Sequence, residues 1–307
     1  MQIVEYNNQF FQELIQFNIK SYPLRVDIEK VISYKLNYSC NEHSTKLLLA
    51  IDENRIIGQI FLLPVCFSHS EEIFYWGMDY IVDNDYRDSP AGVMLLRKVI
   101  KKYNHLGMAF SKLALKIHYV LGETCVGNMK LYIKPNLYFL NSVFKKIKLP
   151  GGEFIYDDDF KIIESLDRLD ISDDNEICIP ERNDNFFNWR FSTFLDRDYY
   201  KIVSKDFSSY AVVRKVSIKR LPFLLLVDYR IDSYSPHSFK RIIKALHKIS
   251  KSENVLGILI YNTIRNFDCI LRKEFFIRIK NIPILSNKQF SQLLITPADS
   301  DFELNIN

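Results

Sequence analysis

A stretch of 24 residues has the layout of an anion-binding site. Residues 79–102 read DYIVDNDYRDSPAGVMLLRKVIKK, so alternating apolar residues lead through a polar turn into apolar residues at helical spacing. When a strand runs through a glycine-bearing turn into a helix, the N–H groups of the first helical turn have no intrahelical partner, and the helix dipole favours negative charge there. The pattern predicts a binding site for a phosphate around Gly92.

The pair Ser89–Pro90 predicts where this helix begins. Serine is a favoured N-cap, and proline at the first helical position costs little because its missing N–H would have no helical partner. Pro90 still removes one donor from a phosphate cradle. The same pair recurs as Ser235–Pro236, but Ser238 then stands where the first copy has Gly92. Only the first turn is therefore expected to let the backbone approach a phosphate closely.

Three titratable residues near this turn could transfer protons. Asp79 is the carboxylate best placed on the strand before the turn, and its alternative is a strand-end residue satisfied by a backbone donor. His118 has an ordinary pKa near 6.5, which suits an acid or a base near neutral pH, although it could also be a buried helix residue packed on the sheet. Tyr119 follows it but points about 100° away on a helix.

The turn resembles motif A of the GNAT superfamily of N-acetyltransferases, V-x-P-x-Y-R-x-x-G-x-G/A-x-x-L-L. The matching residues are Val82, Tyr86, Arg87, Gly92, Leu95 and Leu96, whereas Asn84 and Pro90 replace a usual proline and glycine. A second segment, SKLALKIHYVLG at 111–122, resembles the family's N-x-x-A-x-x-x-Y-x-x-x-G-F. There Ser111 replaces asparagine, His118 replaces tyrosine and Glu123 replaces phenylalanine.

The resemblance implies acetyl-CoA as co-substrate, with its pyrophosphate on the backbone of the turn and its acyl carbonyl at the end of the strand. The residues that it assigns to cofactor binding are Ile81, Val82, Arg87, Asp88, Ser89, Ala91, Gly92 and Ser111. It gives His118 the role of protonating the leaving thiolate, with Tyr119 as the second choice and Asp79 as general base.

The surrounding pattern fits the order of elements in that family. We expect a strand at 1–6, helices at 7–23 and 25–40, a hairpin at 46–67, a strand at 73–82, and then helix 92–103, strand 106–110, helix 112–122 and strand 128–135. After an acidic stretch the order repeats, with Leu106-Gly107 echoed by Leu256-Gly257, 150 residues later. Coincidence of short words is the alternative.

The predicted fold is α/β (α+β), with two GNAT-like units, each a mixed, mostly antiparallel twisted sheet flanked by helices. We place an acetyl-CoA-binding domain at 1–155, an acidic linker or crossover at 156–180, and a degenerate copy without the glycine at 181–307. The C-terminal ITPADSDFEL is expected to be a solvated tail, with an amine-binding cleft as the alternative.

The composition predicts the cellular location of the protein and the kinds of partner it binds. The net charge of +4 is spread along the chain, and the aromatic residues follow strand and helix periods, so no nucleic-acid partner is expected. Five distant cysteines form no C-x-x-C pair and are expected to be reduced thiols in a cytoplasmic protein. Neither a signal peptide nor a membrane span is expected, and the six histidines show no zinc-ligand spacing, so no metal is predicted.

The predicted function is transfer of an acetyl or other acyl group from acetyl-CoA to a small primary amine, with an amino sugar of surface polysaccharide synthesis as the first acceptor suggested by analogy. Two alternatives remain. A FemABX-like aminoacyltransferase would be expected to carry a helical-hairpin insertion and a clustered basic face, which the sequence does not show. A non-catalytic GNAT-like binding protein would account for Pro90 as a record of lost cofactor binding.

Overall fold

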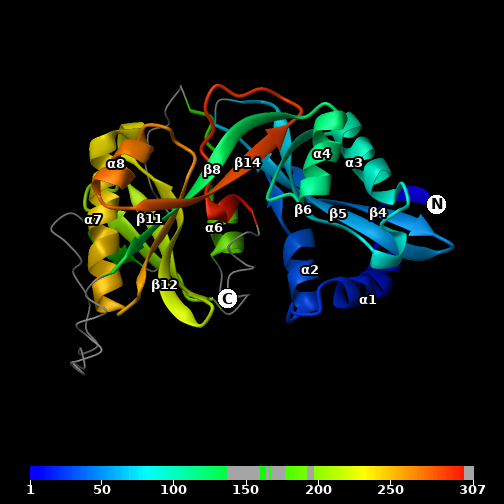
Figure 1. The fold of residues 1–307 in the computed structure, drawn as a ribbon, viewed down its shortest axis with the longest axis horizontal. Coiled ribbons are helices and arrows are strands. Elements are labelled where there is room, and N and C mark those ends of the chain that lie inside the picture. The colour runs from blue at the N-terminus through cyan, green and yellow to red at the C-terminus, as the bar shows by residue number, and fades with distance from the viewer. Residues whose placement is uncertain (69, 137–159, 164–165, 167–176, 192–196, 301–307) are drawn as a thin grey trace. The chain divides into compact units, whose positions relative to one another are not determined.

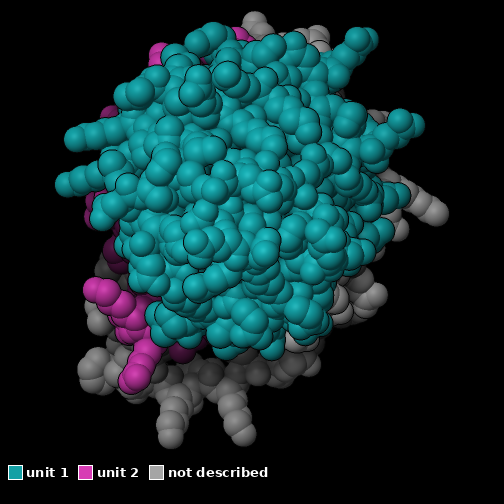
Figure 2. Space-filling model, turned by 90° about the vertical axis from the view of Figure 1, so that its right-hand side faces the viewer, with its two compact units in different colours: residues 1–127, 180–196, 283–290 teal, residues 128–179, 197–282, 291–307 magenta. Residues whose placement is uncertain are grey.

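The chain divides into two units whose segments alternate along the sequence. The computed structural model describes residues 1–68, 70–136, 160–163, 166, 177–191 and 197–300. Unit 1 comprises 1–127, 180–196 and 283–290, and unit 2 comprises 128–179, 197–282 and 291–307 (Figure 2). The sequence suggested domains at 1–155 and 181–307 joined by a linker or crossover at 156–180, and the units of the structure divide first at Gly127.

Unit 1 is built on a sheet with the strand order β1-β4-β5-β6-β7-β14. All neighbours in it are antiparallel except β6 and β7, which are parallel. A separate two-stranded ribbon is formed by β2 and β3. The strands are β1 Gln2–Glu5, β2 Ser39–Cys40, β3 His43–Ser44, β4 Lys46–Asp52, β5 Arg55–Cys66, β6 Ile73–Val82, β7 Asn104–Met108 and β14 Ile277–Ser286.

Helices cover both faces of the unit 1 sheet (Figure 1). One face carries α1 and α2, and the opposite face carries α3 and α4. On the second face, Leu95 and Val99 of α3 pack with Leu48, Ile60 and Leu62 of the sheet. The helices are η1 Asn8–Phe10, α1 Phe11–Ser21, α2 Ile28–Leu36, η2 Asn84–Tyr86, α3 Ala91–Lys102, α4 Lys112–Val120 and α6 Asp184–Arg190.

Unit 2 repeats this plan with the strand order β8-β13-β12-β11-β10-β9. Here β12 and β13 are the parallel pair, and α7 connects them as α3 connects β6 and β7. The strands are β8 Thr124–Pro135, β9 Phe160–Ile163, β10 Tyr200–Ser204, β11 Tyr210–Ile218, β12 Leu221–Arg230 and β13 Gly257–Asn262. The helices are η4 Asp232–Tyr234, α7 Pro236–Ser252, α8 Phe267–Lys273 and η5 Pro297–Asp299.

The two units exchange a strand. β8 follows α4 in the first half of the sequence, yet residues 130–135 pair with β13 of unit 2. Conversely, β14 follows α8 in the second half, yet residues 284–286 pair with β7 of unit 1. The structure thus confirms the duplicated, mostly antiparallel α/β units. The exchange is the reason that no single cut in the sequence separates them.

Three further expectations can be compared with the structure. In the predicted linker 156–180, residues 160–163 form β9 with Phe160 buried, while 156–159, 164–165 and 167–176 lie outside the described residues. The expected solvated tail is wrong for 295–300, which are buried, and its remainder is not described. In the described part of the chain, no helix is long and apolar enough to cross a membrane.

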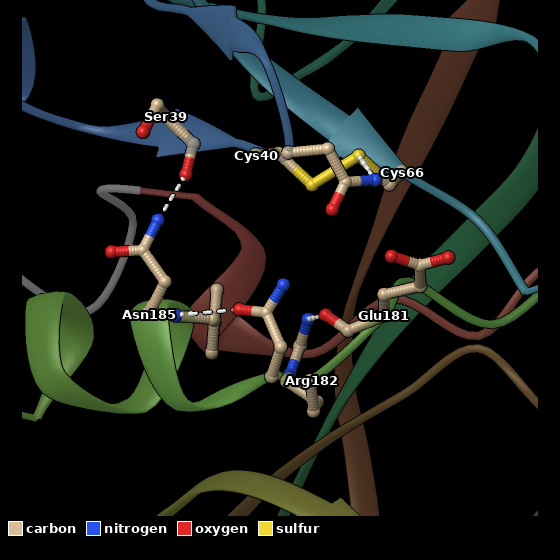
Figure 3. Close-up of a disulfide and its surroundings, with 9 residues drawn as sticks. Ser39, Cys40, Cys66, Glu181, Arg182 and Asn185 are labelled. Atoms are coloured by element: carbon tan, nitrogen blue, oxygen red, sulfur yellow. Dashed lines mark hydrogen bonds between the residues drawn. A yellow bond between two sulfur atoms is a disulfide. The ribbon is translucent and has the colours of Figure 1, made fainter.

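A disulfide corrects the prediction of five separate thiols. Cys40 on β2 and Cys66 at the end of β5 are joined, 26 residues apart (Figure 3). Next to it, Glu181 donates its N–H to the carbonyl of Cys66 at 2.8 Å, and Asn185 of α6 donates to the carbonyl of Ser39 at 2.7 Å. The sequence showed no C-x-x-C pair because the ribbon β2–β3 and the hairpin β4–β5 separate the two cysteines along the chain.

This disulfide gives a first testable prediction. The unreduced protein should titrate three free thiols, at Cys125, Cys178 and Cys269, and the reduced, unfolded protein should titrate all five. Closing a loop of 26 residues restricts the unfolded chain, so Cys66→Ser should lower the free energy of unfolding by about 3 kcal/mol in urea denaturation. Cys125→Ser, at an exposed free thiol, is the matched control and should leave it nearly unchanged. Five thiols in the unreduced protein would contradict the pairing.

Candidate active site

The parallel strands β6 and β7 separate halfway along β6. Their pairing covers only Phe74–Trp76 against Asn104–Leu106. From Gly77 onward β6 is paired with β5 alone, through Ile81 opposite Gln59 and Val82 opposite Gly58. The β7-facing backbone of residues 77–82 therefore has no sheet partner, which is the setting that the sequence predicted for the acyl-binding residues Ile81 and Val82.

A bulge at Asp79 bends β6 at this point. Between Phe61–Met78 and Gln59–Ile81 the register shifts, so β6 has one residue more than β5, and Asp79 has a φ of 47°. A positive φ is unfavourable for a residue with a Cβ. The side chain of Asp79 lies on the face of α1 and α2, whereas a Cβ on Gly77, two residues earlier, would point at His105 on the other face. The bulge thus breaks the strict alternation expected for this strand.

Two cations hold the Asp79 carboxylate. Arg25 donates from both terminal nitrogens, at 2.8 and 2.9 Å, and Lys35 donates at 2.7 Å. Lys35 is only 1% exposed, so this ion pair is shielded from solvent. Burial by itself would raise the pKa of Asp79, but the charges and hydrogen bonds of Lys35 and Arg25 outweigh it and hold the pKa below its usual range. A carboxylate in this setting is a weak base, and its contacts favour a role in holding the bulge.

The turn after β6 leads to a helix start with open N–H groups. α3 begins at Ala91 with Pro90 as its N-cap, one residue later than the sequence suggested. Ser89 still helps the helix start, because its Oγ accepts the Ala91 N–H at 3.3 Å and donates to the Tyr86 carbonyl at 2.6 Å. No hydrogen bond among the described residues occupies the N–H of Gly92 or of Val93. Two donors of the first turn are therefore available to an anion.

The rest of the turn is anchored from α1. Lys20 bridges Asp83 at 2.7 Å and Asp85 at 3.1 Å, which neutralises part of the acidic charge beside the helix start. Arg87 and Asp88 are exposed next to it. Ala91 is buried beneath the turn, and a Cβ on Gly92 would come within 2.8 Å of the Tyr80 hydroxyl. Glycine at residue 92 is thus required by a close approach inside the protein.

Ser111 and Tyr119 belong to the same helix as His118, α4, but their environments differ from that of His118. Ser111 is the N-cap of this helix, and its Oγ accepts the Ala114 N–H at 3.2 Å. Its hydroxyl can still donate one hydrogen bond to a ligand. Tyr119 is 47% exposed, whereas its neighbour His118 is 1% exposed and faces the sheet. The structure therefore does not bring Tyr119 together with the other predicted site residues.

His118 belongs to a buried cluster with two residues that the sequence did not assign. Its Nδ1 contacts Oε2 of Glu123, and Nδ1 of His105 on β7 lies 2.5 Å from Oε1 of the same carboxylate. The two imidazoles stack with centroids 5.7 Å apart and planes inclined by 15°. Burial would raise the pKa of Glu123, but the hydrogen bonds from His105 and His118 lower it to about 2. Burial lowers the pKa of His118, and only part of this is offset by Glu123.

A glycine at the end of α4 brings Glu123 back to His118. Gly122 has a φ of +95°, its N–H bonds to the Tyr119 carbonyl at 3.1 Å, and the Glu123 N–H bonds to the His118 carbonyl at 3.1 Å. These two bonds form a Schellman motif, in which the chain reverses over the last helical turn. Helical spacing alone does not place residues 118 and 123 on one face. The sequence signal that could have found this pair was the carboxylate immediately after a helix-terminating glycine.

The cluster lies where β6 and β7 separate. Phe110, in the turn between β7 and α4, packs on His118 at 4.0 Å between centroids, and Tyr80 from the bulged strand approaches it edge-on at 6.3 Å. Ligand atoms of His105, His118 and Glu123 lie within 4.8 Å of one another, so these residues could also hold a metal ion. However, each carboxylate oxygen already contacts one Nδ1 directly, which is the arrangement of a hydrogen-bonded triad.

Comparisons with solved structures identify the fold. No protein-family model and no curated protein sequence matches the chain. It is similar to a GCN5-related N-acetyltransferase from Anabaena variabilis (8% identity, TM-score 0.63, covering 93% of this chain and 72% of the other). It is also similar to a tandem GNAT protein from the clavulanic acid biosynthesis pathway (10%, 0.53, 94% and 98%) and to Saccharomyces cerevisiae N-myristoyltransferase with bound myristoyl-CoA (10%, 0.54, 96% and 84%). At these identities the likeness concerns the fold, and the chain has the fold of tandem GNAT acetyltransferases.

The Asp79 clamp predicts a loss of stability on mutation. Asp79→Asn removes the buried negative charge that both Lys35 and Arg25 contact, which should lower the free energy of unfolding by about 3 to 5 kcal/mol in urea denaturation at neutral pH. Because the folded-state pKa of Asp79 lies below its ordinary value of 3.8, the stabilisation is complete above that value and is lost as the pH falls below it. The variant should therefore lose less stability than the wild type between neutral and acid pH. Asp85→Asn, whose carboxylate is exposed, is the control and should change the stability little.

Proposed function

We propose that the chain is an acyl-CoA-dependent N-acyltransferase whose unit 1 transfers an acetyl or other acyl group from acetyl-CoA to a primary amine. The observation that carries this proposal is the pair of open N–H groups at the start of α3, beside a strand that separates from its parallel neighbour. The first feature suits a pyrophosphate. The second leaves backbone donors of residues 77–82 for the oxyanion that forms when an amine attacks a thioester.

The proposed cofactor site uses some of the residues that the sequence suggested and gives the others an indirect role. Gly92 would bind the pyrophosphate through its N–H group, and Arg87 would add positive charge at the exposed edge of the turn. Ala91 and Ser89 are used by the helix start itself, so they would shape the turn and would not bind the phosphate directly. Ile81 and Val82 would act through their backbone, and Ser111 through its hydroxyl. Asp88 would lie at the rim.

The proposed proton-transfer residue is His118. Since it is 1% exposed, a thioester that reaches its Nε2 must displace Phe110 or Tyr80. Tyr119 is less well placed, because its phenol lies on the exposed side of α4. We do not assign general-base catalysis to Asp79, since the two cations that hold it stabilise its ionised form.

Unit 2 is proposed to lack its own cofactor site. From Asp228, which follows the extra residue of the bulge in β12, to Ser235 there are seven positions, against ten from Asp79 to Ser89, so the turn is three residues shorter. Ser238 is the counterpart of Gly92 and is buried in the first turn of α7, where its N–H bonds to Ser235 Oγ at 3.1 Å. The corresponding anion site is thus occupied by the protein's own side chain.

The acceptor and the compartment are also proposals. An amino sugar remains the first acceptor to test, on the ground of fold analogy alone. A cytoplasmic location goes with the proposed donor, because coenzyme A thioesters are intracellular metabolites. The Cys40–Cys66 disulfide is uncommon in that compartment, so counting thiols in protein that is trapped with an alkylating agent during cell lysis tests the location directly.

Ligand-induced stabilisation tests acetyl-CoA binding. At a concentration 100 times the dissociation constant, a ligand specific to the folded state adds about 2.7 kcal/mol to its stability and raises the melting temperature. Gly92→Glu should abolish this shift, because it places bulk and negative charge at the open N–H groups. His237→Glu, at the first turn of α7, is the matched control in unit 2 and should retain it. No shift in the wild type would refute the proposed donor site and favour a non-catalytic protein.

Turnover is tested separately by release of coenzyme A thiol against a panel of amines that includes amino sugars. His118→Ala should keep the acetyl-CoA shift and slow turnover by about 10² to 10⁴-fold, the usual range for a lost acid–base residue. Loss of binding in this variant would contradict the role given to His118. Acyl transfer from aminoacyl-tRNA without coenzyme A would favour the FemABX-like alternative.

A further inference from the structure

The buried cluster of His105, Glu123 and His118 fixes where protons sit on the two imidazoles. The carboxylate of Glu123 is ionised, with its pKa lowered to about 2, and an ionised carboxylate can only accept hydrogen bonds. Each imidazole contacts it through Nδ1, so each Nδ1 must carry the hydrogen. Burial lowers the pKa of His118, so this imidazole is neutral and has a single N–H group. Its Nε2 is therefore unprotonated.

Both Nε2 atoms are buried and have no hydrogen-bond partner among the described residues. A buried polar atom without a partner is costly and is found with a functional reason more often than elsewhere. The two atoms differ in what surrounds them. Nε2 of His105 lies 2.5 Å from the point where a Cβ on Gly77 would stand, so it faces the backbone of β6 and has room only because residue 77 is glycine. His118 instead lies against Phe110 and Tyr80, at the separation of the strands.

We propose that Glu123 is a tautomer lock that turns His118 into a proton shuttle, with an unprotonated Nε2 that first accepts a proton and then returns it. This rests on the proposed acyl transfer. It changes the role that the sequence resemblance gave to His118, because a histidine that only protonates a leaving thiolate must begin with a proton on Nε2. Glu123 and His105 are positioning residues in this proposal, since they act through His118.

The shuttle balances within one reaction cycle. The amine nitrogen attacks the thioester carbonyl, a C–N bond forms, and the carbonyl π electrons move to oxygen. Nε2 of His118 takes the proton that the nitrogen loses. The C=O bond then re-forms, the C–S bond breaks, and the thiolate takes the proton from Nε2, which restores the neutral imidazole. No further acid or base is consumed.

The charges around His118 suit this intermediate. Glu123 is the negative group in contact with the ring, and it stabilises the imidazolium that exists between the two transfers, as a buried carboxylate does for the histidine of a serine protease. Burial raises the pKa of Tyr80 to about 12, so its phenol stays neutral. Glu123 therefore stabilises His118 both as the neutral tautomer before proton transfer and as the imidazolium after it.

The test reads the tautomers directly in the full-length protein. Nitrogen-15 NMR of labelled histidines, assigned with His105→Asn and His118→Asn, should show Nδ1–H on both rings and an unprotonated Nε2 on His118 at neutral pH. Glu123→Gln keeps the size of the side chain but presents one donor and one acceptor, so one ring should move its hydrogen to Nε2. The kcat of this variant should fall by about 10²-fold or more while the KM for acetyl-CoA stays unchanged. Glu123→Asp restores a carboxylate and should recover part of the kcat.

Glu72→Gln is the control, because Glu72 is an exposed carboxylate of unit 1 paired with Lys288, and it should alter neither the spectrum nor kcat. A wild-type spectrum with hydrogen on Nε2 of His118, or with both nitrogens protonated at neutral pH, would overturn the lock. Stoichiometric zinc or another transition metal in the purified protein would overturn it as well, because the metal would replace the hydrogens. The expected spectrum without an acetyl-CoA melting shift would refute the acyl transfer and the shuttle but retain the tautomer assignment.

Discussion

The buried ion pair between Asp79 and its two cations is the constraint on which the rest of unit 1 depends. It holds a non-glycine residue at a positive φ, which is unfavourable by itself and persists only where surrounding contacts over-determine it. The resulting bulge turns β6 away from β7 after Trp76 and directs Tyr80 to the face of α3 and α4. Arg25 and Lys35 come from the connection between α1 and α2 and from α2, so the helices on one face determine the shape of the strand that serves the other.

A comparison with unit 2 shows which of these features both units share. Asp228–Tyr229 repeats Asp79–Tyr80 exactly 149 residues later, and β12 also has a register shift beside Asp228. Its carboxylate is held by Tyr210 and Thr296, each at 2.8 Å, and by Arg230 at 3.3 Å, in place of Arg25 and Lys35 of unit 1. The bulge and its buried carboxylate are thus common to both units. The open glycine turn and the triad of His105, Glu123 and His118 belong to unit 1.

Much of the fold and part of the site could be predicted from sequence. The expected hairpin at 46–67 is β4–β5, the strand at 73–82 is β6, and the glycine turn does open α3. Gly92 and His118 could be found because each belongs to a local pattern, a turn or a helix. The contacts of Asp79 with Arg25 and of Glu123 with His105 were missed. Arg25 lies 54 residues from Asp79, and His105 lies 18 residues from Glu123, so neither pair is visible in any spacing rule.

The sequence by itself determined the order and type of most elements of unit 1, the duplication, and the contrast between Gly92 and Ser238, because periodicity, capping and backbone freedom are properties of short segments. The expected helix at 25–40 was wrong at its end, where Ser39–Cys40 form the strand β2. The tertiary structure alone decided the strand exchange between the halves, the Cys40–Cys66 disulfide, the two cations at Asp79 and the contacts of Glu123 with both buried histidines. Each of these depends on which distant groups share a low-dielectric interior. There a charge or a polar atom is stabilised only by the partner that the fold brings to it.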